Sequence, residues 1–238
     1  MMFADRTQAG QLLAGSVEHL AGADPIVLGI PRGGVPVGYE VAVALGAPLD
    51  VIVVRKVGVP FQPELAMGAV GENGVRVVNE EMMRLARVSA DDFAEVEKRE
   101  RAEVQRRAAI FRDGAEAVSI EGRMVIIVDD GIATGSTARA ALQIARARGA
   151  ARVVLAVPVA AAETLESMRS DADEVIAIHA PSDLGAVGYY YRDFRQTTDA
   201  DVVRLLGAAR DPESGTLVRA AQIARDRFVA RNRPIVGG

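Results

Sequence analysis

Short apolar runs rich in β-branched residues alternate with Ala- and Leu-rich stretches, and this order limits the possible folds more than any other feature. Each run has the length of a strand and is apolar almost throughout, which is typical of parallel strands covered on both faces. The predicted strands are Ile26–Ile30, Leu49–Val54, Met124–Val128, Arg152–Val157 and Glu174–Ile178. The predicted helices are Val35–Leu45, Ser136–Arg148 and Ala160–Arg169. The pattern predicts an α/β fold with a doubly wound, mostly parallel sheet of about five strands flanked by helices.

Two short β-type runs interrupt this alternation. Ala66–Val70 and Val75–Val78 are separated by Gly71–Gly74, which is typical of a β-hairpin. We expect this hairpin to be an insertion in the fold. It has two interpretations that the sequence leaves open: a cover over a binding site, or an ordinary hairpin.

A long charged segment, Glu80–Arg112, follows the hairpin and is predicted to be helical. Its pairs Glu97/Arg101 and Glu103/Arg107 are spaced four residues apart with the acid first, the favourable order in a helix. Acidic and basic residues interleave, so a solvated helix face is the simplest interpretation and a nucleic-acid surface is disfavoured.

The end of the chain differs in composition from the rest. Asp211–Gly215 is typical of a linker, and Thr216–Arg231 has the spacing of an amphipathic helix. We therefore divide the chain into one domain over residues 1–210 and a linker with a C-terminal helix over residues 211–238.

Composition excludes several classes of site. The chain of 238 residues has no cysteine, which excludes disulfides, Cys-ligated metals and a Cys nucleophile. Its 2 histidines argue against a multi-His metal site. The net charge of −4 argues against broad, non-specific binding to nucleic acid. The longest apolar run, Val153–Ala162, is far shorter than the roughly 20 residues that span a bilayer. We expect a cytoplasmic protein without a membrane segment.

The most informative stretch is Met124–Ala138, in which an apolar strand ends in Asp129 and Asp130 and a small-residue loop leads into a helix. In open α/β sheets, ligands bind outside the carboxyl ends of the strands. The segment Thr134–Thr137 brings hydroxyls and backbone N–H groups to a helix N-terminus, where anions bind, and Gly135 allows close approach. Carboxylates accept hydrogen bonds from sugar hydroxyls, and the neighbouring N–H and hydroxyl groups can donate hydrogen bonds to a phosphate. Together these groups suit a sugar phosphate.

This stretch has other interpretations. A Walker-A loop needs a lysine before its final Ser or Thr, but Gly135 precedes Ser136. The glycine pattern of dinucleotide-binding folds is absent. The plain structural alternative is two exposed loop acids followed by a helix whose cap is Thr134 or Ser136.

Val125–Ala138 resembles the phosphoribosyl-pyrophosphate (PRPP) motif of the type I phosphoribosyltransferases. Ile30–Gly34 is similar to their short pyrophosphate loop, and Arg55-Lys56 lies where they often place a basic residue at the end of a strand. The segments Pro63–Val70 and 186–194 resemble a bacterial subgroup of stand-alone members whose acceptor is undefined. The resemblance extends to about residue 206.

The resemblance implies a role for each matching residue. Asp129 and Asp130 would hold the ribose hydroxyls and lie close to Mg²⁺, through its waters, and Lys56 would neutralise the leaving group. The residues implied to bind PRPP are Arg32, Gly33, Gly34, Asp129, Asp130, Ala133, Thr134, Gly135, Ser136 and Thr137. The implied catalytic set is Arg32, Lys56, Asp129 and Asp130.

The resemblance leaves the acceptor undefined. Ala133 stands where purine-salvage members carry an acid, which weakens a hypoxanthine or guanine assignment. Tyr189, Tyr191 and Phe194 follow the last predicted strand, where the family builds its acceptor pocket. Their rings either stack on a base or close the edge of the core.

The resemblance implies Mg²⁺-dependent transfer of a phosphoribosyl group from PRPP to a nucleobase or related amine, with release of pyrophosphate. The alternative is a PRPP- or nucleotide-sensing regulator with the same fold and little catalysis. We expect PRPP and a small-molecule acceptor as ligands, no nucleic-acid or membrane partner, and a homodimer.

Overall fold

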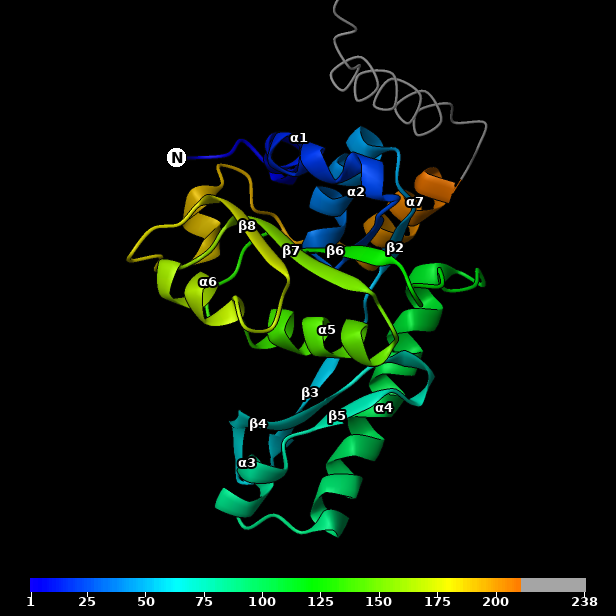
Figure 1. Cartoon of the computed structure of the whole chain (residues 1–238), viewed down its shortest axis with the longest axis vertical. Coiled ribbons are helices and arrows are strands. Elements are labelled where there is room, and N and C mark those ends of the chain that lie inside the picture. The colour runs from blue at the N-terminus through cyan, green and yellow to red at the C-terminus, as the bar shows by residue number, and fades with distance from the viewer. Residues whose placement is uncertain (211–238) are drawn as a thin grey trace, which may run out of the picture.

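Five parallel strands form the main sheet of the computed structural model, which describes residues 1–210 (Figure 1). Their order in the sheet is β2-β1-β6-β7-β8. The strands are β1 Ile26–Gly29, β2 Leu49–Val51, β6 Met124–Val128, β7 Arg152–Val159 and β8 Glu174–His179. The predicted fold class is confirmed, and four of the predicted strands lie within two residues of their observed bounds.

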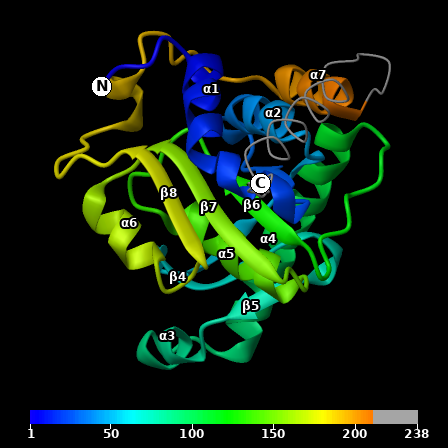
Figure 2. The same ribbon diagram turned by 45° about the horizontal axis from the view of Figure 1, so that its top comes forward.

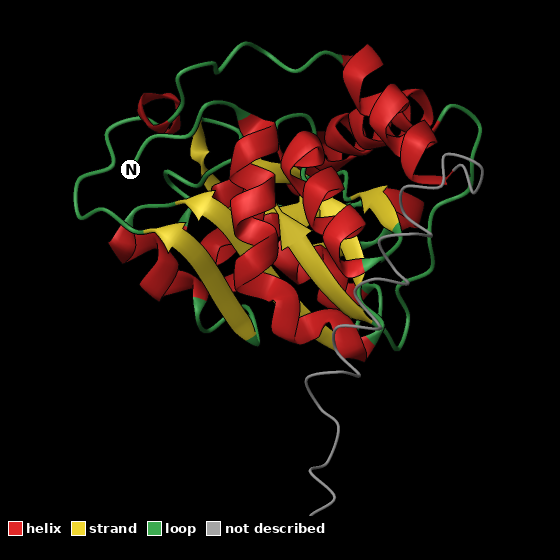
Figure 3. Cartoon of the chain, turned by 90° about the horizontal axis from the view of Figure 1, so that it is seen from above, coloured by secondary structure: helices red, strands yellow, loops and turns green. Residues whose placement is uncertain are grey.

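Helices cover both faces of this sheet. Figure 1 shows α1, α2 and α7 on one face, while α5 and α6 pack on the other. Seen from above in Figure 3, helices lie in front of and behind the strands. The helices are α1 Arg6–Val17, α2 Gly34–Leu45, α5 Ser136–Ala147, α6 Ala162–Met168 and α7 Asp199–Arg210. Three short 3₁₀ segments are Glu18–Ala23, Glu72–Gly74 and Val187–Tyr190. The sequence did not predict α1, because Gly10 and Gly15 lower its helix propensity.

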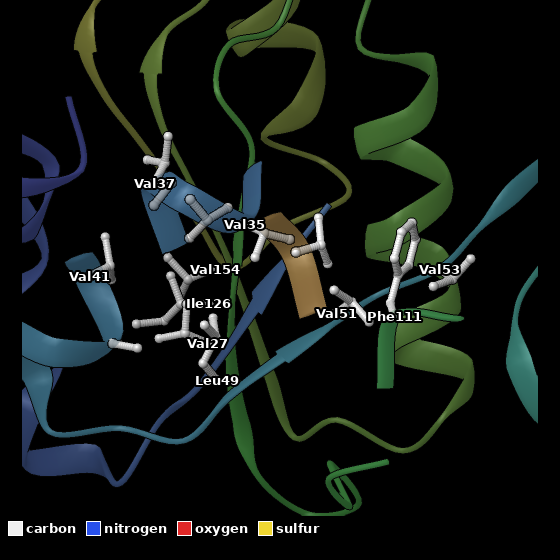
Figure 4. Close-up of a cluster of buried hydrophobic side chains, with 14 of the residues drawn as sticks. Val27, Val35, Val37, Val41, Leu49, Val51, Val53, Phe111, Ile126 and Val154 are labelled. Carbon is white, nitrogen blue, oxygen red and sulfur yellow. The ribbon is translucent and has the colours of Figure 1, made fainter. Parts of the chain in front are cut away.

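Side chains of the central strands point alternately into two separate cores. Val27 and Ile126 belong to the same cluster as Val37 and Val41 of α2, as Figure 4 shows, and this cluster also includes residues of α1. Ile127 instead packs against α5. All these side chains are fully buried. Because both faces are covered, β1 and β6 are apolar throughout, as expected for parallel strands.

A second, antiparallel sheet lies beyond α5, in the order β3-β4-β5 (Figures 1 and 2). Its strands are β3 Arg55–Val59, β4 Gln62–Val70 and β5 Arg76–Val78. The predicted hairpin is confirmed as β4 and β5. This sheet packs on α5, which therefore lies between the two sheets.

The predicted strand Leu49–Val54 is wrong in its second half. β2 ends at Val51, and residues 52–54 cross between the sheets while their side chains stay buried. The apolar run therefore reflects burial between two layers rather than strand pairing. As a consequence, Arg55 and Lys56 begin β3 instead of ending β2.

The helical prediction for Glu80–Arg112 is confirmed. The segment forms two helices, α3 (Glu80–Leu85) and α4 (Ala90–Arg112). The chain turns at Arg87, whose φ is 54°, and α4 starts with a capping box in which Ser89 and Asp92 bond each other reciprocally. That spacing in the sequence was the missed signal.

The solvated-face interpretation of this segment holds for only part of α4. Both acid-first ion pairs, Glu97–Arg101 and Glu103–Arg107, are present. The other face of α4 is buried against the antiparallel sheet and the core, and its buried apolar residues are Phe93, Val96, Val104, Ala108 and Phe111.

Arg112, the last residue of α4, forms a buried ion cluster with Asp50 and Glu72. Its Nε lies 2.9 Å from Asp50 Oδ1, its Nη2 lies 3.0 Å from Glu72 Oε1, and its side chain is 5% exposed. Burial alone would lower the pKa of Arg112, but bonding to Glu72 and Asp50 raises it. Arg210 of α7 adds a contact to Asp50 at 3.4 Å. The cluster joins both sheets to α4 and α7.

The predicted linker 211–215 and the predicted helix Thr216–Arg231 lie outside the described residues, so the domain division remains a prediction. Within residues 1–210, none of the helices combines the length and the apolar character needed to span a bilayer.

Substituting Arg112→Met should destabilise the protein by about 3–5 kcal/mol, because it leaves two buried carboxylates without their cation. Chemical denaturation followed by circular dichroism measures this loss. Arg169→Met is the matched control, since Arg169 pairs with Glu166 on the exposed surface and should leave the transition unchanged. An unchanged transition in the Arg112 variant would contradict the role given to the cluster.

Candidate functional site

The two loops predicted to bind ligand, one after β1 and one after β6, leave the main sheet side by side. β1 and β6 pair in parallel, with Gly29 opposite Val128, so the loops after both strands start at the same sheet edge. The N–H of Ile30 continues the pairing by donating to the Val128 carbonyl at 2.8 Å. The fold thereby brings the Ile30–Gly34 loop next to Asp129 and Asp130.

Glycines allow the first loop to pack directly against the acid pair. A Cβ on Gly33 would lie 2.0 Å from Asp130 Oδ2, and one on Gly34 would lie 2.3 Å from the Val128 carbonyl oxygen. The peptide bond between Pro31 and Arg32 is cis. Any larger side chain at these two positions would push the basic loop away from the carboxylates.

Asp129 and Asp130 form a pair of adjacent, partly buried carboxylates. The N–H of Asp130 donates to Asp129 Oδ1 at 2.9 Å. Burial, reinforced by the neighbouring charge of Asp130, raises the pKa of Asp129 well above its usual range. Burial also raises the pKa of Asp130, although Arg6 opposes that shift. The pair therefore favours a further positive charge beside it.

Arg6, at the start of α1, supplies one positive charge to this pair. Its Nε donates to Asp130 Oδ2 at 2.8 Å, and the two side chains are 12% and 14% exposed. The sequence did not predict this residue. Arg6 lies 124 positions from Asp130 in a helix that was itself missed, so no local pattern marks it.

The small-residue loop after Asp130 ends at the start of α5. Gly135, the residue before the helix, has φ 75° and ψ 0°, and a Cβ there would lie 2.1 Å from Met168 Cε. Thr164 of α6 braces the loop by donating its hydroxyl to the Ala133 carbonyl at 2.7 Å. Thr134, Ser136 and Thr137 are exposed at the helix N-terminus, where the first N–H groups have no partner within the helix. The loop is shaped to receive an anion.

A cavity of about 490 Å³ joins these loops to the antiparallel sheet and α4. Ile30 and Pro31 line it from the first loop, and residues 134, 136 and 137 line it from the second. Its cationic lining residues are Arg55, Lys56, Arg99 and Arg107. The structure thus brings Lys56 to the same cavity as the α5 N-terminus. The sequence did not indicate Arg99 and Arg107 as site residues, because they belong to the charged segment Glu80–Arg112, whose pattern predicts a solvated helix face.

Arg32 lies apart from Lys56. Its Nη1 is 3.5 Å from Asp199 Oδ1 on α7, and it does not line the cavity of Lys56. The backbone of Arg32 belongs to the loop beside the acid pair, whereas its side chain reaches toward α7.

The three aromatic residues predicted for an acceptor pocket differ in their surroundings. Tyr191 is 5% exposed, and its hydroxyl donates to the Asp130 carbonyl at 2.6 Å. Its ring packs between Phe3 and Phe194, with centroids 5.3 and 4.9 Å away. Tyr191 therefore supports the backbone of Asp130, while Tyr189 and Phe194 are exposed.

The donor set fits a magnesium ion carried by a phosphorylated substrate. Mg²⁺ favours one or two carboxylates together with waters and phosphate oxygens. The adjacent carboxylates of Asp129 and Asp130 provide such a pair, and no cluster of three or more metal-ligating His, Cys, Asp or Glu side chains occurs within residues 1–210. A substrate would have to supply the remaining ligands.

Comparison with known proteins agrees with this geometry. A family model described as a phosphoribosyl transferase domain matches residues 6–193. This chain belongs to the phosphoribosyltransferase family. Two proteins named "Putative phosphoribosyl transferase", from two strains of Mycobacterium tuberculosis, are 51% identical to it over 222 residues, which cover 92% of this chain and 50% of each relative. The chain spans about half the length of these relatives.

A solved structure extends the match to the fold. A crystal structure of a Thermus thermophilus protein, TT1426, superposes on this chain with a TM-score of 0.81 and 45% sequence identity, covering 87% of this chain and 98% of the other. The suspected family is thus confirmed. The roles of individual site residues stay predictions.

Gly135→Ala should lower the free energy of unfolding by about 2 kcal/mol or more, because alanine is strained at positive φ and its methyl group would overlap Met168. Thermal and chemical denaturation measure the loss. Gly207→Ala is the control: it lies within α7 with open space around it, so alanine should stabilise that helix slightly. Equal stability of the two variants would contradict the packing described for the loop.

Proposed function

We propose that this protein transfers the phosphoribosyl group of PRPP to a small-molecule acceptor, a nucleobase or related amine, and releases pyrophosphate. One observation carries the proposal. The Ile30–Gly34 loop packs against Asp130 at the edge where β1 and β6 end, with no room for a Cβ on Gly33 or Gly34. Groups that suit a sugar and groups that suit phosphates therefore lie together at a position where α/β folds bind ligands.

Each part of PRPP has a matching set of groups in this proposal. Asp129 and Asp130 accept hydrogen bonds from the ribose 2- and 3-hydroxyls. The N–H groups and hydroxyls of residues 134–137 hold the 5-phosphate at the start of α5. The Ile30–Gly34 loop and Lys56 bind the pyrophosphate. Support for this division comes from the cavity that Lys56 shares with Thr134 and Ser136.

Magnesium is the proposed cofactor, and Asp129 and Asp130 are the residues that would hold it. When bound, it would neutralise charge that develops on the leaving pyrophosphate. The chain's own residues have a positioning role: they fix the ribose between the acid pair and the α5 N-terminus so that C1 faces the acceptor. Lys56 adds fixed positive charge at the leaving group.

Replacing Asp129 and Asp130 together by Asn should weaken binding of Mg·PRPP by about 100-fold or more, because both charged acceptors for the ribose hydroxyls are lost. Isothermal titration calorimetry measures the affinity. Glu166→Gln, on an exposed face of α6, is the control and should bind as the parent does. Unchanged affinity in the double variant would refute the site.

Incubation with PRPP, Mg²⁺ and a panel of nucleobases and amines tests turnover. Release of pyrophosphate that depends on one acceptor supports the transferase and names its substrate. Tight Mg·PRPP binding without turnover across the panel favours the sensing regulator instead. The homodimer and the cytoplasmic location remain predictions.

Arg107→Gln should weaken binding of inorganic pyrophosphate by about three- to tenfold, because Arg107 lines the cationic cavity. Arg106→Gln is a closely matched control. Both arginines bond Glu103, through Nε at 2.6 and 2.8 Å, but Arg106 does not line the cavity. If both variants lose affinity equally, the effect belongs to the charge of α4 as a whole, and Arg107 has no specific role.

A further inference from the structure

We propose that Arg6 is a positioning residue that holds the Asp130 carboxylate in the orientation needed to accept the ribose hydroxyls. This inference rests on the proposed function. Arg6 lies on α1, outside every motif of the sequence, yet its Nε donates to Asp130 Oδ2 at 2.8 Å. The pair is largely removed from solvent, so the attraction is screened far less than at the surface.

Arg6 is fixed at three points. Besides the bond to Asp130, its Nη1 donates to the Arg195 carbonyl at 2.8 Å. Its Cζ also lies 4.0 Å from the centroid of the Phe194 ring, within the range of a cation–π contact. A guanidinium held by two hydrogen bonds and an aromatic ring has little conformational freedom, so Arg6 can act as a fixed support for Asp130.

The Asp130 carboxylate is enclosed from more than one side. Gly33 of the first loop approaches Oδ2 so closely that a Cβ would lie 2.0 Å away, and Arg6 bonds the same oxygen. Tyr191 fixes the backbone of Asp130 by donating to its carbonyl at 2.6 Å. With Oδ2 engaged, Oδ1 is the oxygen left to receive a hydroxyl. The charge of Arg6 also offsets the repulsion between Asp129 and Asp130.

This arrangement gives the aromatic cluster after β8 a different purpose from base stacking. Tyr191 and Phe194 pack on each other with centroids 4.9 Å apart, and both lie near the Arg6 guanidinium. The cluster thus makes two contacts, from Tyr191 to Asp130 and from Phe194 to Arg6. These contacts hold Arg6 and Asp130 in position relative to each other.

Calorimetry on the full chain tests the proposal with two probes, Mg·PRPP and inorganic pyrophosphate without magnesium. Arg6→Gln should weaken Mg·PRPP binding about tenfold, since a charged hydrogen bond to Asp130 is lost. Arg6→Lys keeps the charge without the planar fork and should fall between the parent and the Gln variant. Pyrophosphate binding should be unchanged in both, because Arg6 does not touch the Ile30–Gly34 loop or Lys56 in any described hydrogen bond or ion pair.

Arg195→Gln is the matched control: it removes an exposed cation from the same surface and keeps the carbonyl that Arg6 bonds. It should bind both probes as the parent does. Parent-like or tighter Mg·PRPP binding by the Arg6 variants overturns the proposal, and so does an equal loss of both probes. Failure of the parent itself to bind Mg·PRPP overturns the proposed function instead.

Discussion

The rest of the structure depends on the buried ion cluster of Arg112, Asp50 and Glu72. Asp50 belongs to β2 of the parallel sheet, Glu72 to the turn of the antiparallel sheet, and Arg112 to the end of α4. Removing Arg112 would leave two carboxylates buried without the cation that bonds both, which is costly in a medium of low polarity. The cluster therefore fixes how the antiparallel sheet and α4 sit on the main body.

That fixed arrangement builds the wall of the cavity opposite the α5 N-terminus. Lys56 comes from β3 and Arg107 from α4, and neither element belongs to the parallel sheet. Gly71, which follows β4, lets the second sheet approach α5: a Cβ on Gly71 would lie 2.4 Å from Ile144 Cγ2 of that helix. The active-site candidates thus depend on two layers that pack through one helix, and the cluster holds those layers in register.

The sequence predicted what depends on local pattern. Apolar runs gave the five parallel strands, and the strand-to-helix segment from Met124 to Ala138 gave the candidate site, because both depend on neighbours in the chain. The break at Val51 could not be predicted, since buried residues between two sheets have the same composition as a buried strand. Arg107 appeared solvated because only the packing of α4 shows which face lines the cavity.

Arg6 marks the limit of the same reasoning. Its partner Asp130 is 124 residues away, and the contact exists only because α1 packs on the sheet with its first residue at the carboxyl edge. Periodicity and motif spacing report on neighbours within one element, so a contact between distant segments leaves no trace in either. Three residues contact Arg6 or Asp130, and the sequence predicts a different role for each: an acceptor pocket for Phe194 and Tyr191, and PRPP binding for Gly33.

Charge pairing inside the site has a consequence for how a polyanion binds. Each of the four cations that line the cavity already contacts a carboxylate. Lys56 contacts Glu64 at 3.1 Å, Arg55 and Arg99 contact Glu100 at 2.8 and 3.3 Å, and Arg107 contacts Glu103 at 2.6 Å. Bonding to Arg106 and Arg107 lowers the pKa of Glu103 to about 2, so this carboxylate is ionised at neutral pH. An incoming phosphate group must therefore compete with carboxylates that already contact these cations.

These ion pairs differ in how easily they exchange. Glu64 is 90% exposed on β4, so water can solvate it as soon as Lys56 turns to a phosphate oxygen. Glu100 is 12% exposed and Glu103 bonds two arginines, so releasing either would cost more. Lys56 is therefore the cation that transfers most readily to an incoming anion, while Arg55 and Arg107 keep their carboxylates and set the field around it.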